Sequence, residues 1–363
     1  MASSVPAEKE DRIVFQSGPR NISVRDVIDA AHFRGETDAF WNGLLARVHA
    51  QGEASQSDAE LDEMALEQAS IAFRYKYDLI TAEETEQWLE NRGLTLSDFS
   101  EYFARAEWAK AHRPNSKPEE IPFVQAPAEE RELLTVDLTL EGELDRMATR
   151  LAWRVANHES SEAGELGPAL IDPERERFWQ RAGVQRVEMD AWLGALGRDR
   201  DWLDDNLIME AAYRQQCAKL LTPEARAREI SALRLPLTRL DIETIEFDSQ
   251  DAAREAFLCV RDDGMSMEEV AREGRYPYRG DEMVLEAIPD ELQQKFLSLS
   301  PGAVLEPMPR EDGFLLSRLR GKKEPKIDDA DVCARIERRI LDRYFSDLTS
   351  RWIEWRILFN PPE

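Results

Sequence analysis

Histidine is scarce in this chain of 363 residues, and it is absent between Leu233 and Glu324. The four histidines are His32, His49, His112 and His158, and all of them precede that stretch. Any catalytic or binding role of residues 233–324 must therefore be carried by other side chains.

Cysteine is also rare, since the chain has only Cys217, Cys259 and Cys333. Their odd number, wide separation and lack of CxxC spacing exclude a disulfide framework and a zinc site of the usual kind. Phosphate-binding and dinucleotide-binding loops, G-x-S-x-G and HExxH are absent as well. We therefore predict reduced thiols, no metal and no cofactor.

Long apolar runs are missing too. No stretch of about 20 apolar residues is available to span a membrane. The first ten residues lack a basic segment followed by an apolar one, which predicts the absence of a secretory signal. Together with the cysteine pattern, this predicts a cytoplasmic protein.

Basic residues are outnumbered, with 47 Lys and Arg against 73 Asp and Glu, so the formal net charge is −26. This charge argues against nucleic acid or an anionic membrane as a partner. Residues 1–232 alone carry −18. A partner steered by charge would therefore be basic and would meet this part of the chain.

Most of the first 232 residues show helical periodicity. After an N-terminal segment (1–20), we expect a helical module at 21–112, a proline-rich linker at 113–129 and a second helical module at 130–232. Within the first module, an amphipathic helix over 58–80 is expected to bury Leu61, Met64 and Tyr75. Glu60-Leu-Asp-Glu-Met-Ala is similar to Glu143-Leu-Asp-Arg-Met-Ala, and this leaves duplication and chance similarity as open alternatives.

The periodicity changes at residue 233. Strands are expected around 240–247, 303–308 and 313–319, and helices at 251–260 and 267–271, so residues 233–324 predict a small α+β domain. Residues 325–363 predict a long helix whose apolar stripe ends in Trp352 and Trp355. A stripe of this kind should pack on the helical region or on a second chain.

Five stretches of the α+β segment follow one another in the order found in a known family, over about 85 residues. They are Ile242–Ala253, Gly264–Ala271, Arg279-Gly280-Asp281 as a turn, Ala287–Met308, and Glu311–Leu319 as the last strand. Together these stretches resemble the parvulin family of peptidyl-prolyl cis-trans isomerases. The wider arrangement resembles SurA-like and PrsA-like foldases, in which a helical N-terminal region and a helix after the isomerase domain pack together.

The sequence departs from the parvulin pattern at the positions of the family's histidines. The first position is occupied by Thr244 and the last by Leu315. The resemblance implies an apolar peptide-binding pocket formed by Ile288, Leu292, Met283 and Phe314, for which ordinary core packing is the competing interpretation. Tyr276 and Tyr278 lie in a shortened loop, where they are expected to contact a client peptide.

Three functions remain open at this point. The first is a SurA-like chaperone that binds unfolded or precursor polypeptide through a degenerate isomerase site and escorts a precursor for maturation or export. The second is a weak prolyl isomerase that uses Thr244, Glu243 or Asp312 in place of histidine. The third is a structural subunit that oligomerises through the C-terminal helix.

Overall fold

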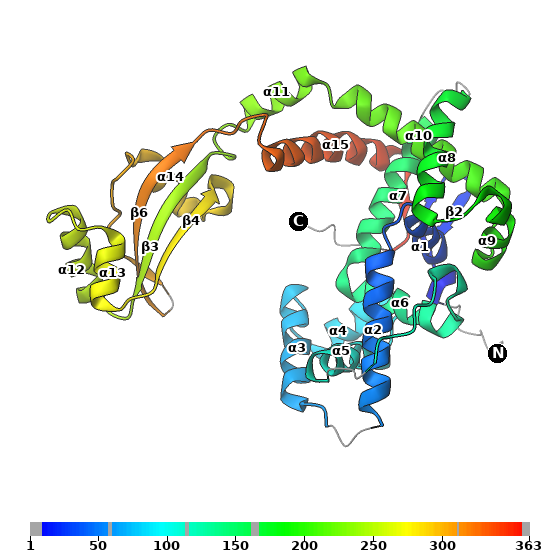
Figure 1. Cartoon of the computed structure of the whole chain (residues 1–363), viewed down its shortest axis with the longest axis horizontal. Coiled ribbons are helices and arrows are strands. Elements are labelled where there is room, and N and C mark those ends of the chain that lie inside the picture. Colours follow the sequence, from blue (N-terminus) through cyan, green and yellow to red (C-terminus); the bar gives the residue numbers. More distant parts are fainter. Residues whose placement is uncertain (1–8, 57–59, 113–115, 161–166, 311, 358–363) are drawn as a thin grey trace. The chain divides into compact units, whose positions relative to one another are not determined.

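The computed structural model describes residues 9–56, 60–112, 116–160, 167–310 and 312–357. The chain divides into two compact units: a helical unit of residues 1–217 and 343–363, and a mixed unit of residues 218–342. The predicted fold class is confirmed, because a helical N-terminal region, an α+β region and a long C-terminal helix are all present (Figure 1). Among the described residues, no helix is long and apolar enough to span a membrane.

In the helical unit, a short 3-10 helix at Lys9–Asp11 and two short strands precede a region that is almost entirely helical. Three of its helices start with the reciprocal side-chain and backbone bonds of a capping box, at Ser23, Thr81 and Thr95. The elements are β1 (Ile13–Ser17), β2 (Arg20–Ser23), α1 (Val24–Phe33), α2 (Asp38–Ala54), α3 (Glu63–Lys76), α4 (Ala82–Asn91), α5 (Leu96–Ala111), α6 (Ala128–Glu141), α7 (Glu143–Ser160), α8 (Pro168–Ala182), α9 (Met189–Leu196) and α10 (Arg200–Leu220).

The predicted buried stripe of α3 is wrong. Met64 is 68% exposed and Tyr75 is 81% exposed, whereas Phe73 is buried. Phe73 packs edge-on against Trp88 of α4 at 5.3 Å. This aromatic contact determines which face of α3 turns inward.

The two predicted helical modules do not form separate units. A single core contains Phe73, Trp88 and Phe99 from the first module and Val136 and Leu140 from the second. The similar sextets also occupy different environments, because Met147 is 1% exposed while its counterpart Met64 points to solvent. Residues of both predicted modules therefore pack in one core, and the two similar sextets are not equivalent in burial.

The last helix, α15 (Ala330–Trp352), begins in the mixed unit and ends in the helical unit. Its first turns pack within the mixed unit, where Ile336 lies against Leu237 in one apolar cluster. Within the helical unit, Phe345 stacks on Trp153 at 5.2 Å. The sequence predicts a helix over 328–357, but α15 ends at Trp352 because β7 (Glu354–Trp355) pairs with β1.

The mixed unit is built on a four-stranded antiparallel sheet with the order β4-β3-β6-β5. Helix α11 (Pro223–Ala232) precedes the sheet. The other elements are β3 (Arg239–Phe247), α12 (Gln250–Arg261), α13 (Met267–Gly274), β4 (Tyr278–Val284), α14 (Asp290–Ser298), β5 (Met308–Arg310) and β6 (Gly313–Lys323).

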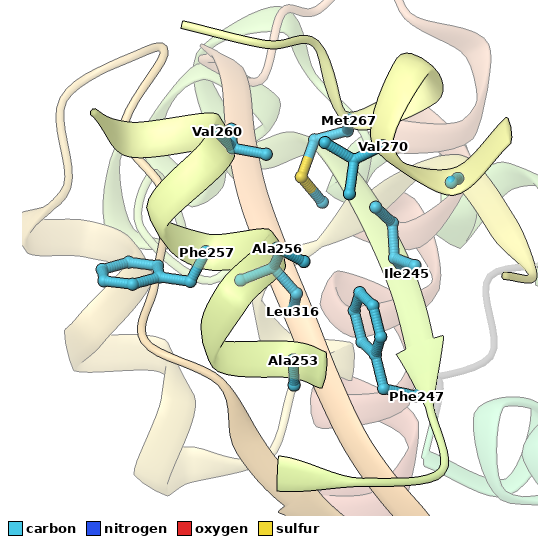
Figure 2. Packing of buried hydrophobic residues seen from close by; sticks show 10 residues of the cluster. Ile245, Phe247, Ala253, Ala256, Phe257, Val260, Met267, Val270 and Leu316 are labelled. Atoms are coloured by element: carbon cyan, nitrogen blue, oxygen red, sulfur yellow. The ribbon is translucent and has the colours of Figure 1, made fainter. Parts of the chain in front are cut away.

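The two faces of this sheet have separate cores. Ile245 and Phe247 of β3 pack against α12 and α13, as Figure 2 shows. Ile242, on the opposite face of the same strand, packs with Ile288 and Phe296 beside α14. This division follows from the alternation of side chains along a strand.

Two strand predictions need correction. The predicted turn at Arg279-Gly280-Asp281 is the middle of edge strand β4, which pairs with β3 over its whole length. The predicted strand at 303–308 is reduced to a single bridge at Val304 and the short strand β5. Pro307 and Pro309 explain the second change, because proline cannot donate a hydrogen bond to a neighbouring strand.

Candidate peptide-binding groove

A groove of about 670 Å³ lies between the sheet of the mixed unit and α14. Its volume is in the range of small-ligand and peptide side-chain pockets. Strands β3, β4 and β6 contribute Ile242, Thr244, Glu246, Arg279, Asp281, Met283, Leu315 and Ser317. Helix α14 and the residues just before it contribute Ile288, Pro289, Glu291, Leu292, Lys295 and Phe296. Strand β5 contributes Met308, Pro309 and Arg310.

The register of the sheet places the floor residues on one face. Thr244 lies opposite Arg279 of β4 and Ser317 of β6. Leu315 lies opposite Glu246, two residues further along β3, so its side chain reaches the same face. Leu315, the residue predicted to face Thr244, therefore lies two residues away from it along the sheet. The residue directly opposite Thr244 on β6 is Ser317.

Five of the residues predicted for this site come together in the groove. Thr244, Leu315, Ile288, Leu292 and Met283 all line it. Ile288 is 4% exposed and belongs to the core beneath the groove, whereas Met283 is 39% exposed at its edge. Ile288 therefore shapes the apolar floor, while Met283 is free to meet a ligand.

The other three predicted residues do not line this groove. Tyr276 packs on Phe247 at 4.5 Å, on the side of α12 and α13. The Tyr278 hydroxyl donates a 2.8 Å hydrogen bond to Glu243, on that same face. Phe314 packs against the α12 core and borders a separate hollow with Phe247 and Asp312.

The position of β4 explains these placements. Tyr278 is opposite Ile245 in the sheet, so it shares the face of Ile245 instead of the face of Thr244. Burial and the hydrogen bond to Glu243 raise the pKa of Tyr278, so the phenol keeps its proton and acts as a donor. Contact of Tyr276 or Tyr278 with a client therefore stays a prediction, and such a contact would lie outside this groove.

The groove has charged groups of both signs around its apolar floor. Glu246, Asp281 and Glu291 are balanced by the basic side chains Arg279, Lys295 and Arg310. Arg310 lies 3.3 Å from Glu246 in an ion pair. Such a lining suits a polypeptide backbone with an apolar side chain better than it suits a strongly charged ligand.

The groove offers little for chemical catalysis. Thr244 and Ser317 supply hydroxyls on its floor. Cys259 lies on α12 against the core of the opposite face. Within the described ranges, no group of three or more His, Cys, Asp or Glu residues could hold a metal ion.

Comparisons with known proteins identify similar structures but no matching family or curated protein. No family model matches the sequence, and neither does any curated protein. Similar solved structures include PrsA-type peptidylprolyl isomerases and SurA-like chaperones.

Three of these structures show the range of similarity. PrsA of Bacillus cereus is 13% identical with a TM-score of 0.35, over 60% of this chain and 86% of that one. PrsA of Bacillus anthracis is 15% identical with a TM-score of 0.29, over 57% and 95%. A SurA-like chaperone of Campylobacter jejuni is 8% identical with a TM-score of 0.20, over 59% and 88%.

Proposed function

We propose that this chain is a chaperone-type protein that binds extended or unfolded polypeptide in the groove between the sheet and α14. The observation that carries this proposal is that Thr244, Leu315, Leu292 and Met283 converge on one groove without a histidine. An apolar client side chain, with proline as the first candidate, would lie on Leu292 and the floor around Ile288. The neighbouring hydroxyl and charged groups would bond the client backbone.

The enzymatic alternative has less support. Of the three residues considered as substitutes for histidine, only Thr244 lines the groove. Glu243 faces the opposite side and accepts a hydrogen bond from Tyr278. Asp312 borders a different hollow.

Escort of a precursor peptide and a cytoplasmic location are finer parts of this proposal. The overall charge of −26 supports a partner other than nucleic acid or an anionic membrane. Oligomerisation through α15 stays a prediction. Ile336 packs with Leu237, and Trp355 packs on Phe15 at 5.3 Å, so part of the predicted stripe is covered within the chain.

Binding in the groove predicts a difference between two matched variants. Met283→Glu should weaken binding of a fluorescein-labelled Leu/Pro-rich peptide by about ten-fold, because it places a charge where an apolar side chain would rest. Leu258→Glu is the control, since Leu258 of α12 is 40% exposed and Met283 is 39% exposed. Fluorescence anisotropy measures both affinities, and equal losses in the two variants would refute the groove as the binding site.

The loss of the histidines predicts little or no isomerase activity. Cis-trans isomerisation of a panel of Xaa-Pro peptides should proceed at the background rate even at high protein concentration. Twisting an amide must overcome a barrier of about 18–20 kcal/mol, and the groove has few groups that could stabilise the twisted state. Clear acceleration that disappears in Met283→Glu but persists in Leu258→Glu would instead establish the enzymatic alternative.

A further inference from the structure

The helical unit contains a second cavity, of about 810 Å³, that the sequence does not predict. Its walls come from α1, α2, residues 118–125, the end of α8, and α9. Five aromatic side chains line it: His32, Phe33, Trp41, Phe123 and Trp192. Leu45, Ile121 and Val184 add aliphatic surface.

Hydrogen bonds and ring contacts hold these walls in place. The Trp41 indole donates a 2.6 Å hydrogen bond to the carbonyl of Ile121, which ties residues 118–125 to α2. The Phe123 ring meets Trp41 edge-on at 5.8 Å and lies 4.5 Å from the His32 ring. His32 in turn stacks on Trp192 at 5.9 Å, with 16° between the ring planes. Phe33, Trp41, Phe123 and Trp192 are all less than 10% exposed, so these rings form a rigid wall behind the cavity.

The backbone of residues 118–125 is partly extended at this wall. Pro122 has φ −60° and ψ 138°, which is close to the polyproline II conformation. Pro118, Glu119 and Glu120 continue the wall, and both glutamates are exposed. Their carboxylates are therefore available at the rim of the cavity.

The charges around the cavity favour a cation. Asp38, Glu119 and Glu120 are acidic, whereas Arg181 is the one basic residue in the lining with a permanent charge. Arg181 already donates to the backbone carbonyl of Phe33. Burial lowers the pKa of His32 to about 4, so this ring is neutral at pH 7 and does not repel a cation.

We propose that this cavity binds a basic, apolar segment of polypeptide, with an apolar side chain against Ile121 and Val184 and an arginine or lysine side chain beside the rim carboxylates. Carboxylates at the rim attract a cationic side chain, and burial of an apolar side chain against the apolar lining adds a favourable contribution. The charge of −18 on residues 1–232 would also speed the encounter with such a segment.

This inference depends on the proposed function in one respect, namely that the protein binds polypeptide. The two sites are chemically distinct, because the groove beside α14 has balanced charges and this cavity has an acidic rim. A client could therefore present an apolar or proline-containing segment to one site and a basic segment to the other.

The test uses the full chain and a short fluorescein-labelled peptide in which arginine and phenylalanine are spaced by serine. The site variant is Glu119→Lys with Glu120→Lys. The control is Glu86→Lys with Glu90→Lys, which changes two exposed glutamates on α4 and alters the net charge by the same amount. Affinities are measured by anisotropy at moderate salt, together with a peptide in which glutamate replaces arginine.

The expected result is a loss of about ten-fold or more for the site variant, a much smaller loss for the control, and no binding of the glutamate peptide. Equal losses in the two variants would overturn the proposal, because binding would then reflect the overall acidic field. Failure of the arginine peptide to bind, while the Leu/Pro-rich peptide still binds the groove, would overturn this site alone. Failure of both peptides would overturn the proposed function as well.

Discussion

Replacement of Asp29 by alanine is expected to lower the free energy of unfolding of the helical unit by about 3 kcal/mol. Asp29 of α1 is fully buried. It accepts a 2.8 Å hydrogen bond from Arg131 of α6 and a 2.7 Å hydrogen bond from Arg198, which precedes α10. The variant would leave two largely buried guanidinium groups without their main carboxylate.

The expected value is at the lower end for a broken buried ion pair, because both arginines keep a second partner. Arg131 also bonds Glu10, and Arg198 also pairs with Asp26. Urea unfolding followed by tryptophan fluorescence measures the change. Asp190→Ala is the control, because Asp190 and its partner Arg200 are both 70% exposed and should contribute little. Equal shifts in the midpoints for the two variants would contradict the assigned role of Asp29.

Asp145→Asn is expected to stabilise the helical unit increasingly as the pH rises. Asp145 of α7 is 7% exposed, and its Oδ1 atom has no hydrogen-bond partner among the described residues. Burial raises the pKa of Asp145 to about 7, and the nearby charge of Arg92 opposes this shift only in part. The guanidinium of Arg92 lies over the Trp88 ring at 3.9 Å.

The direction of the pH effect follows from proton binding. In the unfolded chain, the Asp145 carboxyl has its ordinary pKa of 3.8. The folded protein therefore binds this proton more tightly than the unfolded chain does. The contribution of Asp145 to the stability of the wild type therefore falls as the pH rises from about 4 to about 7 and then levels off. Asparagine does not ionise, so the variant escapes this loss.

Comparison of the two proteins at pH 5 and pH 8 isolates the contribution of Asp145. The stability of Asp145→Asn relative to wild type should increase by about 2–3 kcal/mol between these pH values, since one pKa unit corresponds to about 1.4 kcal/mol. Other titrating groups cancel in the difference between the proteins. Asp190→Asn should show no such increase, because Arg200 lowers the pKa of that exposed carboxyl. A difference that does not vary with pH would show that Asp145 is ionised throughout.

The α+β fold and much of the groove can be predicted from the sequence. Alternating apolar residues locate β3 and β6, and the motif around Ile288 and Leu292 locates the helix beside them. Because side chains on one face of a sheet recur at every second residue, Thr244 and Leu315 come to the same surface. The same alternation along β6 could have identified Ser317.

The remaining features depend on tertiary packing that local patterns do not contain. Strand β4 contains a glycine and several charged residues, so the sequence predicts a turn there. Without this strand, the sequence does not show that Tyr276 and Tyr278 lie on the side of the sheet that faces α12 and α13. Helix α3 buries the face that carries Phe73, because Phe73 packs on Trp88 of the next helix. The predicted apolar stripe with Met64 and Tyr75 is therefore exposed. The cavity at Trp41 brings together residues separated by about 150 positions, and no short motif predicts it.

The discontinuous helical unit has a consequence for biosynthesis. Strand β1 lies between β2 and β7, and β7 is formed by Glu354 and Trp355 near the other end of the sequence. At about 5–20 residues per second, a ribosome needs on the order of 20–70 s to make the intervening residues. The mixed unit, residues 218–342, is complete before β7 emerges. Nascent chains should therefore carry a finished mixed unit while one edge of β1 still awaits its partner.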